Sequence, residues 1–445
     1  MSDESLIKAE KDFTHTLDAQ FPEIDQIVKT DAAQGLERLL LLEKQVRQAS
    51  DLVSSKRVLT KIIHLFKQTH DWKLMNEQVQ LLSKKHGQLK VAITHMIQEV
   101  IDILDSIPEL DTKIETIENI RTVTEGKIFV EVERARVSRT LAHIKQEQGD
   151  VAEATKILCE LQVETYGSMD HREKTEFILE QVELCLKIGD YTQALILSRK
   201  IMPRTLNKED LQDLKLRYYE LRIEISLEKN DYLDICQHYQ AIYSLPCIAN
   251  DEVKWKEALS NIVHYIILAP YDNLQSDLIN KIALDPRLPK LTLHHELVKN
   301  FTAYELMRWP KVKEIYGSQL RASTVFDTSK PSGQQHWRDL RMRVIEHNIR
   351  VVCKYYTRIR ISRLNTLLDL SEKETEDCIS KLVTQGTIFA KINRPQRIVN
   401  FSKPKDSNEI LNEWSNNIST LLGHVETIGH LITKEEMMNG IKSSS

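Results

Sequence analysis

A helix-ending signal recurs along this chain with a spacing of about forty residues. It is carried by four dipeptides: His70-Asp71, Gly149-Asp150, Gly189-Asp190 and Asn230-Asp231. The last three are 40 and 41 residues apart, and the first lies near two periods upstream. Gly and Asn can end a helix in the left-handed conformation, and the carboxylate of a following Asp can cap the next helix. Each dipeptide therefore predicts a junction of two helices.

Apolar residues keep the same places around each junction. Pairs stand eight and six residues before the Asp: Ile63/Leu65, Ala142/Ile144, Val182/Leu184 and Ile223/Ile225. Another residue follows it by four positions: Met75, Ala154, Ala194 and Ile235. Weaker junction signals are Asp31, Asp111 and Asp272. A helix pair every forty residues predicts a stacked α-solenoid, in which each pair buries its apolar face against its neighbours. A bundle of unrelated antiparallel helices is the alternative.

Composition agrees with a mainly α chain that has a large core. Only 12 of the 445 residues are Gly and 11 are Pro, which argues against a turn-rich β architecture. Hydrophobic residues make up 41% of the chain and charged residues 28%. The net charge of −4 lacks the basic excess that a protein bound to a nucleic-acid backbone normally carries.

The sequence carries no signal for a membrane or an oxidising compartment. Residues 1–5 are acidic and lack the apolar core of a signal peptide. The most apolar run, 265–269, is far shorter than the ~18 residues needed to span a bilayer. No two cysteines have Cys-x-x-Cys spacing, and all six are interpreted as reduced core thiols of an intracellular protein. They are Cys159, Cys185, Cys236, Cys247, Cys353 and Cys378.

The stretch 358–401 changes its apolar period several times. Ile359 and Ile361 alternate with arginines, which predicts a strand, and helical spacing follows from Leu364. Ser371 and Glu374 form the capping box of a second helix, which is predicted to bury Ile379, Leu382 and Val383 and to end at Gly386. Two strands are predicted after it, at 388–392 and 397–401, joined by a turn at 393–396. Together with the long helix before it, this order predicts a winged helix.

The third strand of this module is predicted to lie at the edge of its sheet. It consists of Arg397, Ile398, Val399, Asn400 and Phe401. An edge offers unpaired N–H and C=O groups to another chain, and Val399 with Phe401 supplies one apolar face. The sequence therefore predicts a subunit interface here. A strand covered by its own C-terminal segment is the alternative.

The last segment, 406–439, has apolar residues at alternating intervals of three and four. We call these residues the seam: Leu411, Trp414, Ile418, Leu421, Val425, Ile428 and Ile432. Such spacing over three heptads is typical of a helix that packs along one face against other helices. Because this helix follows a linker, it is predicted to join a bundle with helices of other subunits. Packing against its own chain is the alternative.

These signals divide the chain into five parts. They are a helical segment at 1–30 with a break near Pro22, a solenoid at 31–322, a linker at 323–335, a winged helix at 336–401 and the seam helix at 406–439.

Motifs of catalysis are missing from the sequence. His294-His295-Glu296 does not continue into the zinc-protease pattern His-Glu-x-x-His, and Gly126-Lys127 lacks the upstream Gly of a phosphate loop. No Gly-x-Ser-x-Gly elbow occurs. The sequence therefore predicts no enzyme, no cofactor and no metal site.

Winged helices often bind nucleic acid, and the charges on two helices of this module indicate whether it could do so. The helix at 372–385 is acidic and would be repelled by phosphates. The helix before it is basic, and its cations are Arg338, Arg341, Arg343, Arg350, Lys354, Arg358, Arg360 and Arg363. Its basic face is interpreted as solvated or as a subunit contact, with RNA binding as the alternative.

The run from Leu370 to Ile392, with the hairpin and strand 397–401 after it, resembles the PCI domain. Members of this family occur in the proteasome lid, the signalosome and a translation initiation factor complex. The resemblance implies a helical-repeat stack capped by a winged helix, whose helical half is the end of the solenoid. It also implies a non-catalytic scaffold subunit, here of the proteasome lid.

For such a subunit the resemblance implies a set of partners. Winged helices of neighbouring PCI subunits join side by side, and the C-terminal helices form one bundle with a pair of metalloprotease deubiquitinase subunits. The solenoid arm would contact the ATPase ring and the core particle. The resemblance also implies a function in ubiquitin-dependent protein degradation, in the cytoplasm and the nucleus. The alternatives are a scaffold of a sister PCI complex and an RNA-associated PCI protein acting through 338–363.

Overall fold

The computed structural model describes residues 13–208 and 211–443, and its chain divides into two compact units after Asn230. The helices of the first unit are α1 (Thr14–Thr30), α2 (Ala32–Gln48), α3 (Leu52–Thr69), α4 (Trp72–Lys84), α5 (Lys90–Ile103), α6 (Leu110–Thr124), α7 (Glu131–Glu147), α8 (Val151–Cys159), α9 (His171–Ile188), α10 (Tyr191–Arg199) and α11 (Gln212–Lys229). Short 3-10 turns lie between them at η2 (Leu104–Ser106), η3 (Ile128–Val130), η4 (Val163–Thr165) and η5 (Thr205–Asn207).

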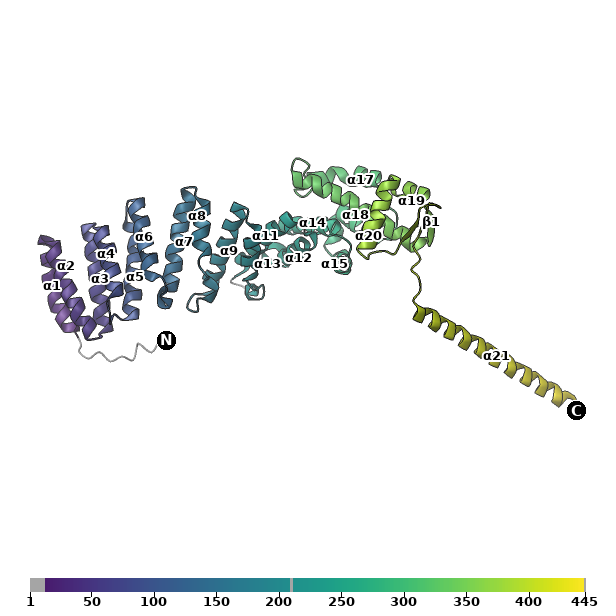
Figure 1. The fold of residues 1–445 in the computed structure, drawn as a ribbon, viewed down its shortest axis with the longest axis horizontal. Helices are drawn as coiled ribbons and strands as arrows, with labels where there is room; N and C mark the ends of the chain where they lie inside the picture. Colours follow the sequence, from purple (N-terminus) through teal and green to yellow (C-terminus); the bar gives the residue numbers. More distant parts are fainter. Residues whose placement is uncertain (1–12, 209–210, 444–445) are drawn as a thin grey trace. The chain divides into compact units, whose positions relative to one another are not determined.

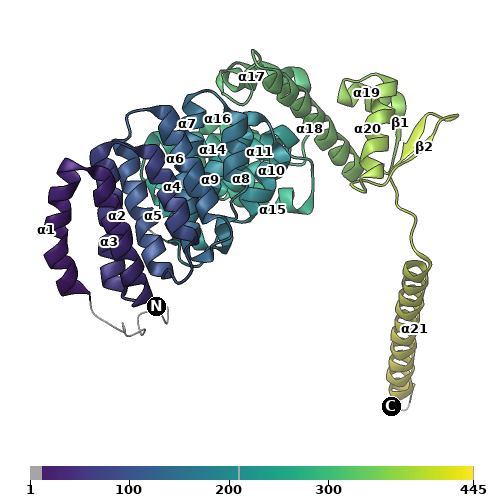
Figure 2. The same cartoon turned by 60° about the vertical axis from the view of Figure 1, so that its left-hand side comes forward.

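The first unit is a stack of antiparallel helices, as Figures 1 and 2 show. Most helices pack on the next one, and α1, α3, α4, α5 and α9 pack on the helix after next. This pattern is that of a solenoid, in which each helix pair contacts the pairs beside it. The predicted α-solenoid is confirmed.

The four junction dipeptides have the predicted geometry. His70, Gly149, Gly189 and Asn230 all have positive φ angles, between 56° and 90°. Each following Asp accepts a hydrogen bond from the backbone N–H three residues on, at 3.1 to 3.5 Å. The residue four positions after each Asp is completely buried: Met75, Ala154, Ala194 and Ile235. Of the weaker signals, Asp31 and Asp272 cap α2 and α15, whereas Asp111 lies inside α6.

The predicted break near Pro22 is wrong, because α1 runs through it without interruption. Proline removes one backbone donor from a helix and disfavours its interior. Here Leu17, Phe21 and Ile24 are buried on one face of α1, and this packing holds the helix together. The part of that prediction before residue 13 lies outside the described residues.

The second unit begins with helices that form the helical half of the C-terminal module. They are α12 (Tyr232–Tyr243), α13 (Pro246–Ala249), α14 (Glu252–Leu268), α15 (Asn273–Ala283), α16 (Thr292–Thr302), α17 (Trp309–Ala322) and α18 (Pro331–Tyr355), with a 3-10 turn η7 (Leu288–Lys290). The helix α14 is the centre of this group, since it packs on α12, α15, α16 and α18.

The predicted linker 323–335 is too long at its C-terminal end, because α18 starts at Pro331 instead of His336. Proline suits the first turn of a helix, where its missing N–H has no partner to lose. The segment before it is not a free tether either: Phe326 is only 1% exposed, and the backbone oxygen of Val325 lies 2.7 Å from Nδ1 of His336. A Cβ on Gly333 would lie 2.0 Å from the backbone oxygen of Asp327, so this close approach requires glycine.

The winged helix follows α18 with the predicted order of elements. They are β1 (Arg358–Arg360), α19 (Ile361–Leu368), α20 (Glu372–Thr384), β2 (Lys391–Asn393) and β3 (Ile398–Asn400). The capping box of Ser371 and Glu374 is confirmed, and Gly386 has a φ of 72°. Three details differ: Ile361 opens α19 instead of ending β1, β2 starts only at Lys391, and Val383 is 37% exposed.

The predicted edge position of 397–401 is wrong, because β3 is the central strand. The sheet has the order β1-β3-β2, with both pairings antiparallel. Val399 stands opposite Ile359 on one side and Ile392 on the other. Apolar alternation gives a strand one buried face but does not say which strands flank it. The outer edges of β1 and β2 are the free edges of this sheet.

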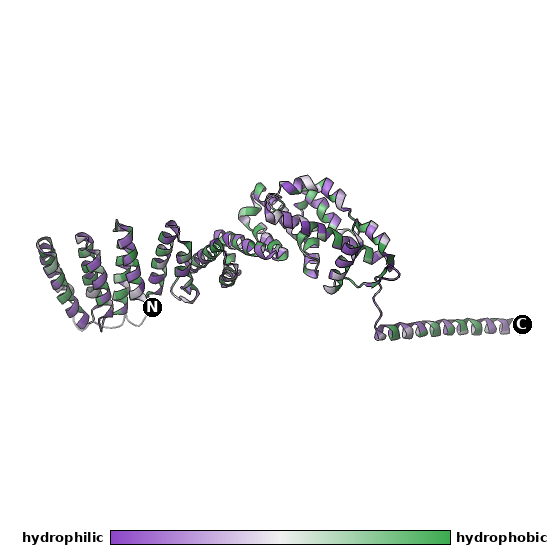
Figure 3. Cartoon of the chain, turned by 45° about the horizontal axis from the view of Figure 1, so that its top comes forward, coloured by the Kyte–Doolittle hydropathy of each residue, from purple (hydrophilic) through white to green (hydrophobic). Residues whose placement is uncertain are grey.

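The last helix, α21, runs from Ser407 to Ser443, somewhat longer than the predicted 406–439. Each of its residues from 407 to 440 is exposed. Figure 3 shows that apolar residues recur along the whole of this helix, which ends at the label C.

Candidate assembly interface

The seam of α21 is an exposed apolar stripe. Its residues range from 40% exposure at Ile418 to 63% at Trp414. Three more exposed apolar residues, Ile410, Leu422 and Leu431, widen the stripe on either side. They are not among the predicted seam residues, although their helical spacing is visible in the sequence. A contiguous apolar surface on a soluble chain is typical of a protein contact. No residue of α21 from 407 to 440 is buried by another part of the described chain.

The winged-helix sheet offers two edges, neither of which is the predicted strand. Val399 is completely buried and Phe401 is 6% exposed, so these side chains fill the module's core with Leu364 and Leu382. The outer edge of β2 has exposed Lys391 and Asn393. Charged side chains on an edge suppress non-specific pairing while leaving the backbone free for a matched strand.

Aromatic residues flank both edges of the sheet, and none of them was predicted as an interface residue from the sequence. Tyr355 and Tyr356, which lead into β1, are 67% and 40% exposed. Phe389, which leads into β2, is 37% exposed. Exposed aromatic side chains are enriched at protein interfaces, where they supply large contact areas.

The basic helix does not present one continuous cationic face. Arg343 forms an ion pair with Glu346 at 2.8 Å. The guanidinium of Arg350 lies 3.6 Å from the ring centroid of Tyr271, and the ammonium of Lys354 lies 3.3 Å from that of Tyr304. These three cations therefore interact within the chain, whereas Arg358, Arg360 and Arg363 remain exposed.

The helix α20, which would enter a DNA groove, is bound into the module through its acidic residues. Glu374 is held in the capping box, and Glu376 pairs with Arg394 of the hairpin at 3.3 Å. A groove of about 300 Å³ between α18 and α20 has Arg338, Arg341, Glu374, Asp377 and Lys381 around an apolar floor. Its mixed charge does not match a phosphate backbone.

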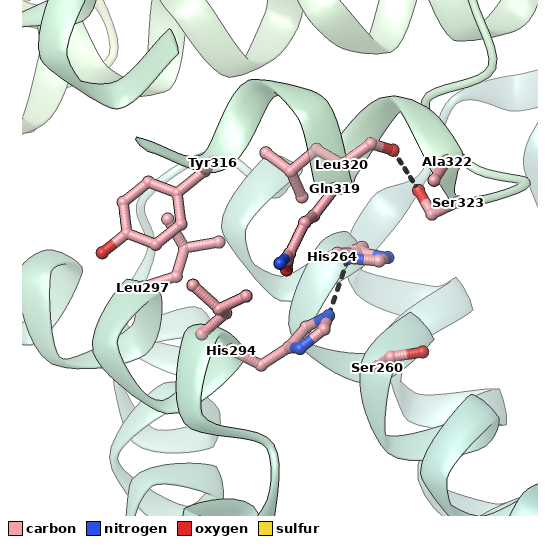
Figure 4. A pocket seen from close by; sticks show the side chains of 10 residues that line it. Ser260, His264, His294, Leu297, Tyr316, Gln319, Leu320, Ala322 and Ser323 are labelled. Atoms are coloured by element: carbon pink, nitrogen blue, oxygen red, sulfur yellow. Dashed lines mark hydrogen bonds between the residues drawn. The ribbon is translucent and has the colours of Figure 1, made fainter. Parts of the chain in front are cut away.

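A second cavity, of about 270 Å³, lies between α14, α16 and α17, as Figure 4 shows. His264 and His294 meet in it with their Nε2 atoms 3.1 Å apart. Burial lowers the pKa of His264 to about 3, and the neighbouring His294 acts in the same direction. Burial also lowers the pKa of His294, so at neutral pH both rings are uncharged and one donates a hydrogen bond to the other. The rest of the lining mixes apolar and polar side chains: Leu293, Leu297, Leu320, Ala322, Tyr316, Ser260, Gln319 and Ser323.

We expect acid to destabilise this unit through His264. Its pKa is about 3 in the folded chain but near the ordinary ~6.5 when unfolded, so below pH 6.5 only the unfolded state binds the proton. His264 alone should lower the free energy of unfolding by about 2 kcal/mol between pH 7 and pH 5, and the buried His347, whose pKa is lowered to about 4, adds to this fall. Urea unfolding at the two pH values measures this. His264→Phe should reduce the pH dependence, whereas His430→Gln, at a side chain 79% exposed, should not.

The described residues are those at 13–208 and 211–443. They contain no group of three or more His, Cys, Asp or Glu side chains placed to hold a metal ion. None of their helices is both long enough and apolar enough to cross a membrane.

Three family models match successive parts of the chain. Residues 34–251 match the N-terminal model of PSMD12/CSN4, and residues 305–403 match the PCI domain. Residues 408–440, which contain the seam, match the C-terminal domain of the 26S proteasome regulatory subunit RPN5.

Relatives match over the full length. The chain is 54% identical to the 26S proteasome regulatory subunit RPN5 of Saccharomyces cerevisiae, over 100% of both chains. It is 47% identical to the regulatory subunit rpn501 of Schizosaccharomyces pombe, over 98% of this chain and 99% of that one. The 26S proteasome non-ATPase regulatory subunit 12 of Dictyostelium discoideum is 40% identical over 99% and 98%.

Proposed function

The chain belongs to the PCI-domain family of the 26S proteasome regulatory subunit RPN5, and from this we propose that it is a scaffold subunit of the proteasome regulatory lid. Within that family we propose that the chain corresponds to the fifth non-ATPase subunit of the lid. The observation that carries the proposal is 54% identity over the whole length, since the solenoid, the winged helix and the seam helix are all included. Its role is to support ubiquitin-dependent protein degradation.

The seam helix supplies the first contact of this scaffold. Its stripe is exposed along α21, and a helix with one apolar face is stable in water chiefly when that face is packed. We propose that helices of other lid subunits, including the metalloprotease deubiquitinase pair, pack against this stripe.

The winged helix supplies the second contact. Because β3 is central, neighbouring PCI subunits would meet the outer edges of β1 and β2 and the aromatic residues beside them. The solenoid would contact the ATPase ring and the core particle. We further propose that the chain has no catalytic activity of its own and acts in the cytoplasm and nucleus.

Affinity purification of the tagged full chain, followed by native mass spectrometry, tests the proposal. We expect recovery of lid, ATPase-ring and core-particle subunits in complexes of defined stoichiometry. Recovery of a sister PCI complex in their place, or recovery that ribonuclease abolishes, would overturn it.

A further inference from the structure

Two cysteines of the solenoid stand in contact. Cys159 is the last residue of α8, and Cys185 lies in α9, which packs beside α8 in Figures 1 and 2. Their Sγ atoms are 3.8 Å apart. Because a disulfide bond requires ~2.0 Å, rotation of the two side chains must close the remaining gap.

The two thiols differ in their access to solvent. Cys159 is partly exposed, whereas Cys185 is only 1% exposed. Cys159 is therefore the more accessible of the two residues to a small oxidant, and the sulfur of Cys185 lies within 3.8 Å of its sulfur. This is the arrangement of an attacking and a resolving cysteine.

Electrostatics assign the same two roles. The hydrogen bond from Cys185 lowers the pKa of Cys159, and the ammonium of Lys200 lowers it further, against burial and the carboxylate of Asp190. The same hydrogen bond, together with burial, raises the pKa of Cys185. The thiolate is the reactive form of cysteine, so Cys159 is the sulfur that reacts first.

We propose that Cys159 and Cys185 are an oxidative modification site that hydrogen peroxide converts into a reversible disulfide. The Cys159 thiolate attacks one peroxide oxygen, the O–O bond breaks, and the departing hydroxide takes a proton to become water. The sulfur of Cys185 then attacks the sulfenic acid at Cys159, the S–O bond breaks, and the hydroxide combines with the Cys185 proton. The two thiols lose two electrons in total, and the peroxide is reduced to two waters.

The bond would close the connection between α8 and α9, in which η4 lies. Opening of these two neighbouring helices away from each other would then be blocked. The folded reduced chain already holds the two sulfurs in contact, at 3.8 Å.

Peptide mapping of the purified full chain tests the proposal. The chain is treated with hydrogen peroxide, the remaining thiols are alkylated, and the digest is analysed by mass spectrometry. We expect a peptide that links Cys159 to Cys185, a loss of two titratable thiols per chain, and recovery of both with dithiothreitol. Oxidation spread over other cysteines without this linked peptide would overturn the proposal, and this readout needs no variant.

Three variants separate the roles of the two sulfurs. Cys185→Ser should stop at a sulfenic acid on Cys159 that dimedone traps. Cys159→Ser should lose thiols at least tenfold more slowly than the wild type. Cys247→Ser, which removes an exposed cysteine elsewhere, should still form the linked peptide at the wild-type rate. Equal rates of thiol loss in the wild type and a folded Cys159→Ser variant would contradict the assignment.

Discussion

Ile418→Asp combined with Val425→Asp is expected to leave the chain folded and to prevent its entry into the regulatory lid. The two side chains are 40% and 58% exposed, so their replacement removes no core contact. In a packed bundle the same two carboxylates would be buried without partners, at a cost of several kcal/mol. Since each 1.4 kcal/mol is a tenfold change in affinity, co-purification with lid subunits should fall by at least about a hundredfold.

A matched variant on the opposite side of α21 is the control. Asn416→Asp combined with Thr427→Asp adds the same charge, but with 3.6 residues per turn these positions face away from the seam. It should assemble like the wild type, and thermal unfolding of both isolated variants should match it within about a degree. If the seam variant assembled at the wild-type yield, the bundle role of α21 would be lost.

The solenoid was predictable because its signal is local. A residue that tolerates the left-handed conformation followed by an Asp fixes a junction whatever the tertiary structure, and all four such dipeptides have this geometry. The missed junction at Ser50-Asp51 shows where this reasoning stops. Ser50 has a φ of 55° and Asp51 caps α3, but serine is rarely found in that conformation. The surrounding packing therefore determines this turn, and the residue types at this position do not predict it.

The sheet was predictable in its elements but not in its order. Alternating apolar residues at 397–401 and 359–361 fit either a central or an outer strand, because alternation reports only which face is buried. The position of β3 depends on β1 pairing with it from the far side, a contact between residues about forty positions apart. The prediction of a linker at 323–335 failed for a similar reason, because Val325 and Phe326 are core residues within a segment of loop-like composition.

The seam could be read from sequence because it needs no knowledge of the chain's own fold. Its spacing defines one apolar face, and the structure leaves that face exposed. The strand interface failed because it depended on a tertiary arrangement. The spacing within one helix was thus enough for the seam, whereas the position of a strand in its sheet depends on strands elsewhere in the sequence.

Val399→Asp should unfold the winged helix itself, and this result separates a central strand from an edge strand. Val399 is 0% exposed between Ile359 and Ile392. A carboxylate there loses its hydration without gaining a partner, and the valine contacts are lost as well. We expect the module to lose about 3–5 kcal/mol of stability in the isolated chain. Hydrogen exchange of the amides of β1, β2 and β3 should show the loss.

Asn393→Asp is the matched control, since it places the same charge in the same sheet at an exposed position on β2. The Asn393 side-chain oxygen accepts from the backbone N–H of Gln396 at 3.3 Å, and an Asp keeps that acceptor. The Asn393 amide also donates to Oε1 of Gln396 at 3.0 Å, an exposed bond that water replaces in the Asp variant. The variant should therefore unfold within about 0.5 kcal/mol of the wild type. If Val399→Asp were equally stable but failed to assemble, β3 would be acting at an interface after all. Loss of stability in Val399→Asp alone, before any partner is present, instead leaves the outer edges of β1 and β2 as the surfaces that a neighbouring subunit can reach.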